Sequence, residues 1–248
     1  MSVGRHRDDL LAELAAVDAQ LAAPEVVDLL ARVQGLHSMA RLTAFSLSSF
    51  EEQVAQLSNA SFSRQLLMEP RSQTHLQFVE RLQHLMANYV LSAVPLLEHA
   101  RSHVVEHYPD GSPTRVQYER GLDMAINHDD RHKVIVQLRH QIAHRSLPAV
   151  TLIAGNHGEQ VATPVIDRRP LLADRRCKGR VRETLESLTM DAMSLDGLIL
   201  ADGTYVMEFV EWFAGIQAMH EIKALTPVGR LQQRREAILG ALEQHGRR

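Results

Sequence analysis

Apolar residues recur at intervals of three and four along most of this chain, which is the pattern of amphipathic α-helices. Pro24 stands where a helix can begin, because proline is tolerated in the first turn. Pro95 lies inside a long helical pattern and is expected to kink it. Helices are predicted in the first half of the chain at 7–22, after Pro24, at 38–57 and at 75–107. The Ser-rich stretch 58–74, which contains Pro70, is predicted to be a long connection.

The pattern changes in the second half of the chain. The run Tyr108-Pro109-Asp110-Gly111-Ser112-Pro113 is typical of a turn, and a helix is predicted on each side of 128–130, at 114–127 and 131–146. Asp129 or Asp130 is expected to cap the second of these helices. Two β-rich runs, 150–154 and 161–166, flank Gly155-Asn156-His157-Gly158 and predict a β-hairpin. Helical patterns then return at 180–197, 204–223 and 228–245, with a break at Thr226-Pro227.

These elements predict an all-α fold: a helical bundle of seven to nine helices with one inserted β-hairpin at about 150–166. The length of 248 residues is sufficient to bury a substantial core. We expect the N-terminal helices of 1–57 to pack on a bundle formed by 75–248, so that the whole chain makes one continuous domain.

Composition narrows the classes of protein. The single cysteine, Cys177, excludes an intramolecular disulfide framework and a zinc site built from several cysteines. No apolar run approaches the roughly 20 residues that span a bilayer, and the polar N-terminus lacks the core of a signal peptide. We therefore expect a soluble, cytoplasmic protein without a membrane partner. The net charge of -3 argues against a protein that binds nucleic acid over most of its surface.

The sharpest chemical feature is the segment 138–148, which ends the helix before the hairpin. His140 and His144 are four residues apart and share one helix face, whereas Arg139 lies about 140° from His144. A neutral histidine can take the proton from a ribose 2′-hydroxyl. An arginine can hold the phosphate with two hydrogen bonds and stabilise its developing charge. These residue types are suitable for metal-independent RNA cleavage, although such side chains are also common on ordinary polar helix faces.

The segment 138–148 resembles the signature of the HEPN-domain family, in which an arginine and a polar residue are followed by a histidine. Here Arg139, His140 and His144 match it, and Leu147-Pro148 and the hairpin follow as in a subgroup of large members. The resemblance implies an all-α homodimer with facing motifs. It also implies an endoribonuclease that leaves 2′,3′-cyclic phosphate and 5′-hydroxyl ends and needs no cofactor. Arg139 and His144 would then be catalytic, with His140 supporting them.

Many members of this family act as toxins or in abortive-infection and other antiviral systems. The resemblance therefore implies RNA as the substrate, with tRNA as one candidate, and a neutralising or regulatory partner protein. Other members have lost activity and serve as dimerisation or interaction modules, and that alternative stays open.

A basic run follows the hairpin and is a candidate for binding the phosphate backbone of RNA. Between 167 and 182 it has seven basic residues against Asp167 and Asp174. The alternative is a solvated linker. The candidate RNA-binding residues are Arg145, Arg168, Arg169, Arg175, Arg176, Lys178, Arg180 and Arg182.

A metal-binding bundle is the other alternative. His99, His103 and His107 repeat at helical spacing, and imidazoles on one face can bind zinc or iron. The three residues span about 12 Å, which is too far for one ion without a bend in the helix. The chain also lacks the Glu-x-x-His pairs of di-iron bundles. A polar stripe is therefore the simpler interpretation.

Overall fold

The computed structural model describes residues 2–127, 130–155, 161–188 and 191–246, with side chains from 7 to 244. They belong to two compact units, one formed by Met1–Gly35 and Phe213–Arg248 and the other by Leu36–Trp212. Residues 36–57 thus belong to the same unit as the hairpin, whereas 213–248 share a unit with the N-terminal helices.

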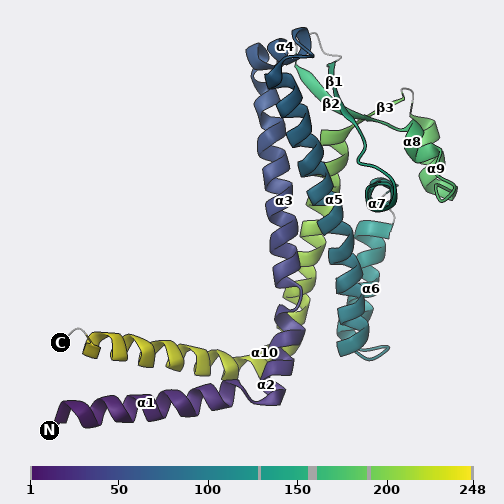
Figure 1. The fold of residues 1–248 in the computed structure, drawn as a ribbon. Coiled ribbons are helices and arrows are strands. Elements are labelled where there is room, and N and C mark those ends of the chain that lie inside the picture. Colours follow the sequence, from purple (N-terminus) through teal and green to yellow (C-terminus); the bar gives the residue numbers. More distant parts are fainter. Residues whose placement is uncertain (1, 128–129, 156–160, 189–190, 247–248) are drawn as a thin grey trace. The chain divides into compact units, whose positions relative to one another are not determined.

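The unit 36–212 contains the helical bundle and the sheet (Figure 1). Its elements in chain order are α3 (His37–Ala55), a 3-10 turn (Gln56–Ser58), α4 (Ala60–Met68), α5 (Gln73–His107), α6 (Pro113–Leu122), a π-helix (Asp123–Asn127), α7 (Asp130–His144), β1 (Val150–Ala154), β2 (Ala162–Asp167), α8 (Arg169–Leu172), α9 (Gly179–Ser187), β3 (Ala192–Ser194) and the first part of α10 (Leu195–Gly246). The all-α bundle with an inserted hairpin is confirmed.

The core of this unit lies where α3, α5, α7 and the first part of α10 meet. Their apolar stripes bury large side chains completely, among them Phe50, Met86, Ile135 and Ile199. Gly203 lets α10 approach α3 closely, because a Cβ atom at this position would lie 2.4 Å from Cδ1 of Leu47. Burial of these apolar surfaces is the main stabilising contribution.

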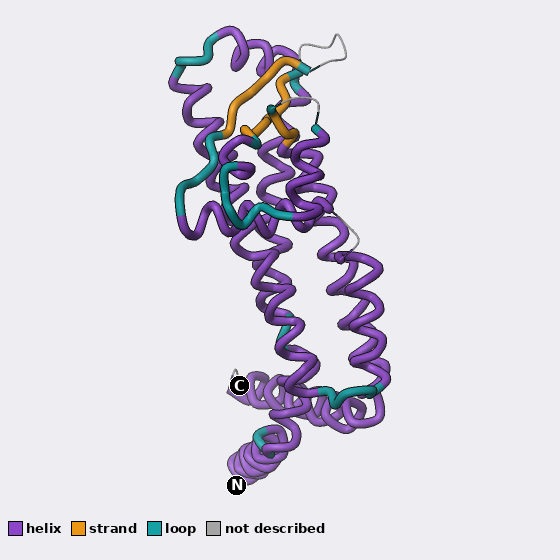
Figure 2. The backbone as a smooth tube through the Cα atoms, turned by 90° about the vertical axis from the view of Figure 1, so that its right-hand side faces the viewer, coloured by secondary structure: helices purple, strands orange, loops and turns teal. Residues whose placement is uncertain are grey.

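The hairpin is confirmed, and it is part of a three-stranded antiparallel sheet in the order β1-β2-β3 (Figure 2). Val150 lies opposite Ile166, and Ile166 lies opposite Met193. The third strand contradicts the expected helix over 180–197, since α9 ends at Ser187. A strand of three residues is too short to show an alternation of apolar and polar positions in the sequence. Its extended conformation depends on pairing with β2.

The predicted connection over 58–74 is also wrong, because α4 occupies much of it. Asn59 caps this helix: its side-chain oxygen accepts hydrogen bonds from the backbone amides of Ser61 and Phe62 at 3.1 and 3.2 Å. Leu66 is fully buried and anchors α4 to the core. Ser61 and Ser63, two of the serines that suggested a loop, lie on this short helix.

The break expected at Thr226-Pro227 does not occur, and α10 runs through it as one helix of 52 residues. Proline has no backbone N–H, so the carbonyl one turn before it loses a partner. The hydroxyl of Thr226 donates to the carbonyl of Ile222 at 2.7 Å, which adds a hydrogen bond in the same turn. Within the described part of the chain, no helix is long and apolar enough to span a membrane.

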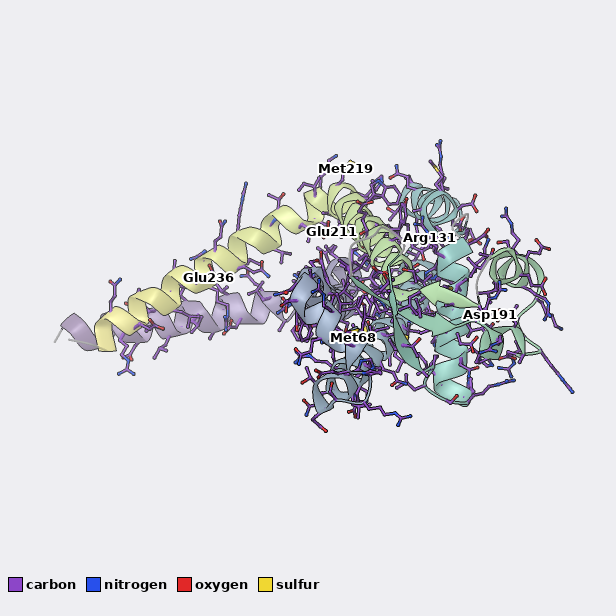
Figure 3. The ribbon with its side chains drawn as sticks, turned by 90° about the horizontal axis from the view of Figure 1, so that it is seen from above. Met68, Arg131, Asp191, Glu211, Met219 and Glu236 are labelled. Atoms are coloured by element: carbon purple, nitrogen blue, oxygen red, sulfur yellow. The ribbon has the colours of Figure 1, made fainter. Side chains whose placement is uncertain are left out.

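The other unit pairs α1 (Ser2–Leu21) and α2 (Pro24–Gln34) with the C-terminal part of α10. Arg234 and Arg235 reach Glu13 and Asp18 on α1, each at 2.7 Å. The side chains of this unit include Glu236, labelled in Figure 3. Val17 and Ile238 are buried between the helices.

One buried polar network ties the bundle together. Asp202 on α10 is 1% exposed and accepts hydrogen bonds from the Tyr89 hydroxyl at 2.6 Å and from His132 Nδ1 at 2.9 Å. Burial, followed by the charge of Asp202, raises the pKa of Tyr89 above its usual range, so this hydroxyl stays protonated and donating. The network joins α5, α7 and α10.

We expect Asn59→Ala to lower the free energy of unfolding by about 1 kcal/mol, because two amides at the start of α4 lose their acceptor. Asn59→Asp keeps an acceptor at the same position and should stay close to the wild type. Urea denaturation followed by circular dichroism measures both variants. Equal loss in the two variants would show that the cap is not the cause.

Candidate functional site

Helix α7 separates the arginine of the motif from its two histidines. The Arg139 guanidinium lies 3.4 Å from Oε1 of Glu98 on α5. His140 instead contacts the segment between α8 and α9, and α7 lies between α5 and that segment (Figure 1). In the single chain, the structure therefore brings His140 and His144 together and leaves Arg139 on another side of the helix.

The two imidazoles form a pair on the surface of α7. Their ring centres are 4.6 Å apart and the rings are inclined at 51°. Residues four apart on a helix lie one above the other, so this contact follows from the spacing. His140 is half-buried, whereas His144 is exposed.

Asp174 lies beneath this pair and is only 2% exposed. Its Oδ1 accepts the backbone N–H of Arg176 at 2.9 Å and lies 3.3 Å from the Arg145 guanidinium. Its Oδ2 is 3.8 Å from Nε2 of His140 and has no hydrogen-bond partner within the described ranges. The N–H of Arg176, followed by the charge of Arg145, lowers the pKa of Asp174 despite its burial. A fixed negative charge thus faces the imidazoles.

The charge of Arg176 acts on His140 from the solvent side. Its guanidinium donates to Nε2 of His140 at 2.5 Å. Because a guanidinium has no acceptor, this ring nitrogen must carry a lone pair, and His140 is neutral in this contact. Desolvation, the charge of Arg176 and the nearby His144 lower the pKa of His140, while Asp174 opposes the shift. His140 is therefore placed to accept a proton near neutral pH.

Most of the basic run has structural contacts instead. Arg168 donates to the carbonyls of Leu185 and, at 2.7 Å, of Leu188, so it caps the end of α9. It also contacts Asp191, labelled in Figure 3. The remaining pairs are Arg169 with Asp167 at 2.6 Å, Arg182 with Glu186 at 2.8 Å and Arg180 with Asp130 at 3.9 Å.

Four of the predicted RNA-binding residues stay available near the histidines or in the adjoining loop. Arg145 and Arg176 contact Asp174 or His140 directly. Arg175 and Lys178 are exposed and have no ionic partner among the residues that the structure describes. Together they give the site a positive surface suited to a phosphate ester.

The histidine stripe of α5 has no metal-binding arrangement. His103 is buried and its ring lies 4.6 Å from that of His107 and 6.5 Å from that of His99. In the described segments no group of three or more His, Cys, Asp or Glu residues could hold a metal ion. The rings follow one another along one helix, with an edge-to-face contact between His103 and His107 and a tilted contact between His99 and His103.

The residue of this candidate site that the sequence does not single out is Asp174. It is one of two acidic residues in the basic run, between α8 and α9. An acid that interrupts a run of arginines was the available signal, because a carboxylate that is buried must be paired or hydrogen-bonded and cations lie close to it in sequence. Its partners His140, on α7, and Arg145, just after α7, are 34 and 29 residues away in sequence, so the pairing emerges only in the fold.

We expect Asp174→Asn to lower the pKa of His140 further, because Asp174 opposes the shift caused by burial and by Arg176. Arg176→Gln should raise it, since a neighbouring positive charge is removed. Titration of the histidine ring protons by NMR measures both shifts. Asp191→Asn removes an exposed acid elsewhere and should leave His140 unchanged; a shift as large as in Asp174→Asn would contradict the contact.

Comparisons with family models, with curated proteins and with solved structures each give no match for this chain.

Proposed function

We propose that this protein is a metal-independent endoribonuclease whose active site is the group formed by His140, His144, Arg145, Arg176 and Asp174. The observation that carries the proposal is the pair of imidazoles 4.6 Å apart, with a guanidinium on one side and a buried carboxylate beneath it. The resemblance of segment 138–148 to the HEPN signature supports the same reaction and the role of His144, whereas we assign the task of the signature arginine, Arg139, to Arg145 and Arg176.

The neutral His140 is the general base of the reaction, and its lone pair becomes available when the Arg176 guanidinium turns from the ring to the phosphate. It takes the proton of the 2′-hydroxyl, and the resulting oxygen attacks the adjacent phosphorus. The bond from phosphorus to the 5′-oxygen then breaks, and His144 gives that oxygen a proton. The products are a 2′,3′-cyclic phosphate and a 5′-hydroxyl, so water is not consumed in this step.

The guanidiniums of Arg145 and Arg176 hold the scissile phosphate and stabilise its developing charge. Each has five N–H donors, so the contacts with Asp174 and His140 leave donors for the substrate. Asp174 is the positioning residue, because it fixes Arg145 and faces His140. In the single chain Arg139 contacts Glu98, and we assign it no role in holding the phosphate.

The cellular role that the resemblance supports is that of a toxin or antiviral effector, acting as a homodimer with a neutralising or regulatory partner. The alternative is an inactive interaction module. Such a protein would form the same homodimer and bind a partner, but it would not cleave RNA.

We expect the purified protein to cleave total RNA or tRNA in EDTA, with His140→Ala and His144→Ala each lowering the rate about 100-fold or more. Arg176→Ala should lower it by a smaller factor, since Arg145 still holds the phosphate. Arg139→Ala should stay within about threefold of the wild type. Gel analysis of 5′-labelled RNA measures the rates, and a 2′-deoxy nucleotide at the cleaved position should block the reaction.

His99→Ala is the matched control, because it removes an exposed histidine from a different helix. Undiminished cleavage in His144→Ala would reject the active site. Loss of cleavage in Arg139→Ala, with Arg176→Ala fully active, would transfer the phosphate-binding role to the arginine of the motif.

Expression of the wild type in bacteria is expected to arrest growth, whereas His144→Ala at an equal protein level should not, because a toxin of this type acts by degrading RNA. Colony counts after induction give the comparison. Arrest by both proteins would point to toxicity unrelated to cleavage.

A further inference from the structure

A second polar site lies on the other side of α7, in a cavity of about 290 Å³ between α5, the π-helix and α7. Its apolar wall is formed by Val94, Leu97, Ile126 and Val136. Its polar lining includes Glu98, Arg101, Lys133 and His132. None of these residues belongs to the group around His140, so the cavity is independent of the proposed ribonuclease site.

His132 is the most constrained polar group of the lining. Asp202 can only accept hydrogen bonds, so the Nδ1 of His132 must donate to it at 2.9 Å. This contact fixes the ring and leaves Nε2 as the remaining polar atom. Nε2 has no hydrogen-bond partner in the described part of the chain, although the side chain is only 11% exposed. In its neutral form the ring therefore presents Nε2 to the cavity as an oriented acceptor.

Arg101 supplies the charge of this site. Lys133 is held by Asp130 at 2.9 Å, and Glu98 lies 3.4 Å from Arg139, so these two lining charges are compensated. No carboxylate among the described residues forms an ion pair with Arg101, whose known contact is the phenol of Tyr118. A guanidinium without a counterion favours a carboxylate, which it can bind through two parallel hydrogen bonds.

The backbone of the wall is itself unusual. Asp123–Asn127 form a π-helix, a conformation that is rare and is found frequently at functional sites. Ile126 and Asn127 of this segment line the cavity. The adjoining cavity of about 450 Å³ shares Arg101, Leu122 and Asn127 with it, which leaves room for a ligand larger than a single carboxylate.

We propose that this cavity binds a small hydroxy acid with an apolar tail. Arg101 pairs with its carboxylate, Nε2 of His132 accepts the hydrogen bond of its hydroxyl, and the tail lies against Leu97, Ile126 and Val136. The proposal does not depend on ribonuclease activity.

The test uses three probes with the same tail: 2-hydroxyhexanoate, hexanoate and 1,2-hexanediol. The first has both polar groups, and each of the others lacks one. Titration of the full-length protein followed by ¹H–¹⁵N NMR of the histidine rings should show a saturable shift at His132 Nε2. The dissociation constant for 2-hydroxyhexanoate should be at least tenfold lower than for either analogue.

Arg101→Gln should weaken binding of 2-hydroxyhexanoate about tenfold and leave binding of the diol unchanged, which a general loss of structure would not do. His132→Gln tests the acceptor, and circular dichroism establishes that both variants fold. Arg81→Gln is the charge-matched control, because it removes an exposed arginine of α5 that does not line the cavity. Absence of a saturable shift, equal affinity for the three probes, or full affinity in folded Arg101→Gln would each overturn the proposal.

Discussion

A carboxylate buried in a helical core must be hydrogen-bonded, because an unpaired charge there costs several kcal/mol. Asp202 satisfies this requirement with Tyr89 on one oxygen and His132 on the other. This contact determines which side of α7 faces the core. Arg139 comes seven residues after His132, about two helical turns, and therefore lies on nearly the same side. His140 and His144 are consequently turned towards α8 and α9.

A second buried acid, Asp174, contacts the C-terminal end of α7, and its partners differ from those of Asp202. Asp174 comes from a loop and is stabilised by the backbone N–H of Arg176 together with the charge of Arg145, whereas both partners of Asp202 are side chains. One carboxylate thus orients a histidine that lines a cavity, and the other lies 3.8 Å from His140, the half-buried member of the histidine pair. The same helix can therefore serve two chemically distinct sites.

Regular features of the fold were predictable because their determinants are local. The hairpin follows from two β-rich runs around a turn. The start of α6 follows from Ser112, whose side chain caps the helix, and from Pro113, which occupies its first turn. The features that were missed depend on contacts distant in sequence. The strand β3 exists because β2 lies beside it, and α4 is stabilised by burial of Leu66 in a core that the sequence does not reveal.

In the candidate site, too, the local contacts were predictable from the sequence and the distant ones were not. Spacing alone places His140 next to His144, and this contact is present. Spacing also separates Arg139 from them, but only the fold identifies Glu98 as its partner. Composition drew attention to the arginines as a group, whereas their separation into helix caps, internal pairs and site residues required knowing where each acid lies.

The close approach of α10 to α3 at Gly203 has a consequence for how this protein can change over generations. A larger residue at 203 meets the Leu47 side chain at 2.4 Å, and a smaller residue at 47 leaves a void beside a glycine. Each substitution alone is unfavourable, while the two together exchange volume across the contact. These two positions should therefore vary as a pair among descendants of this sequence, although 156 residues separate them along the chain.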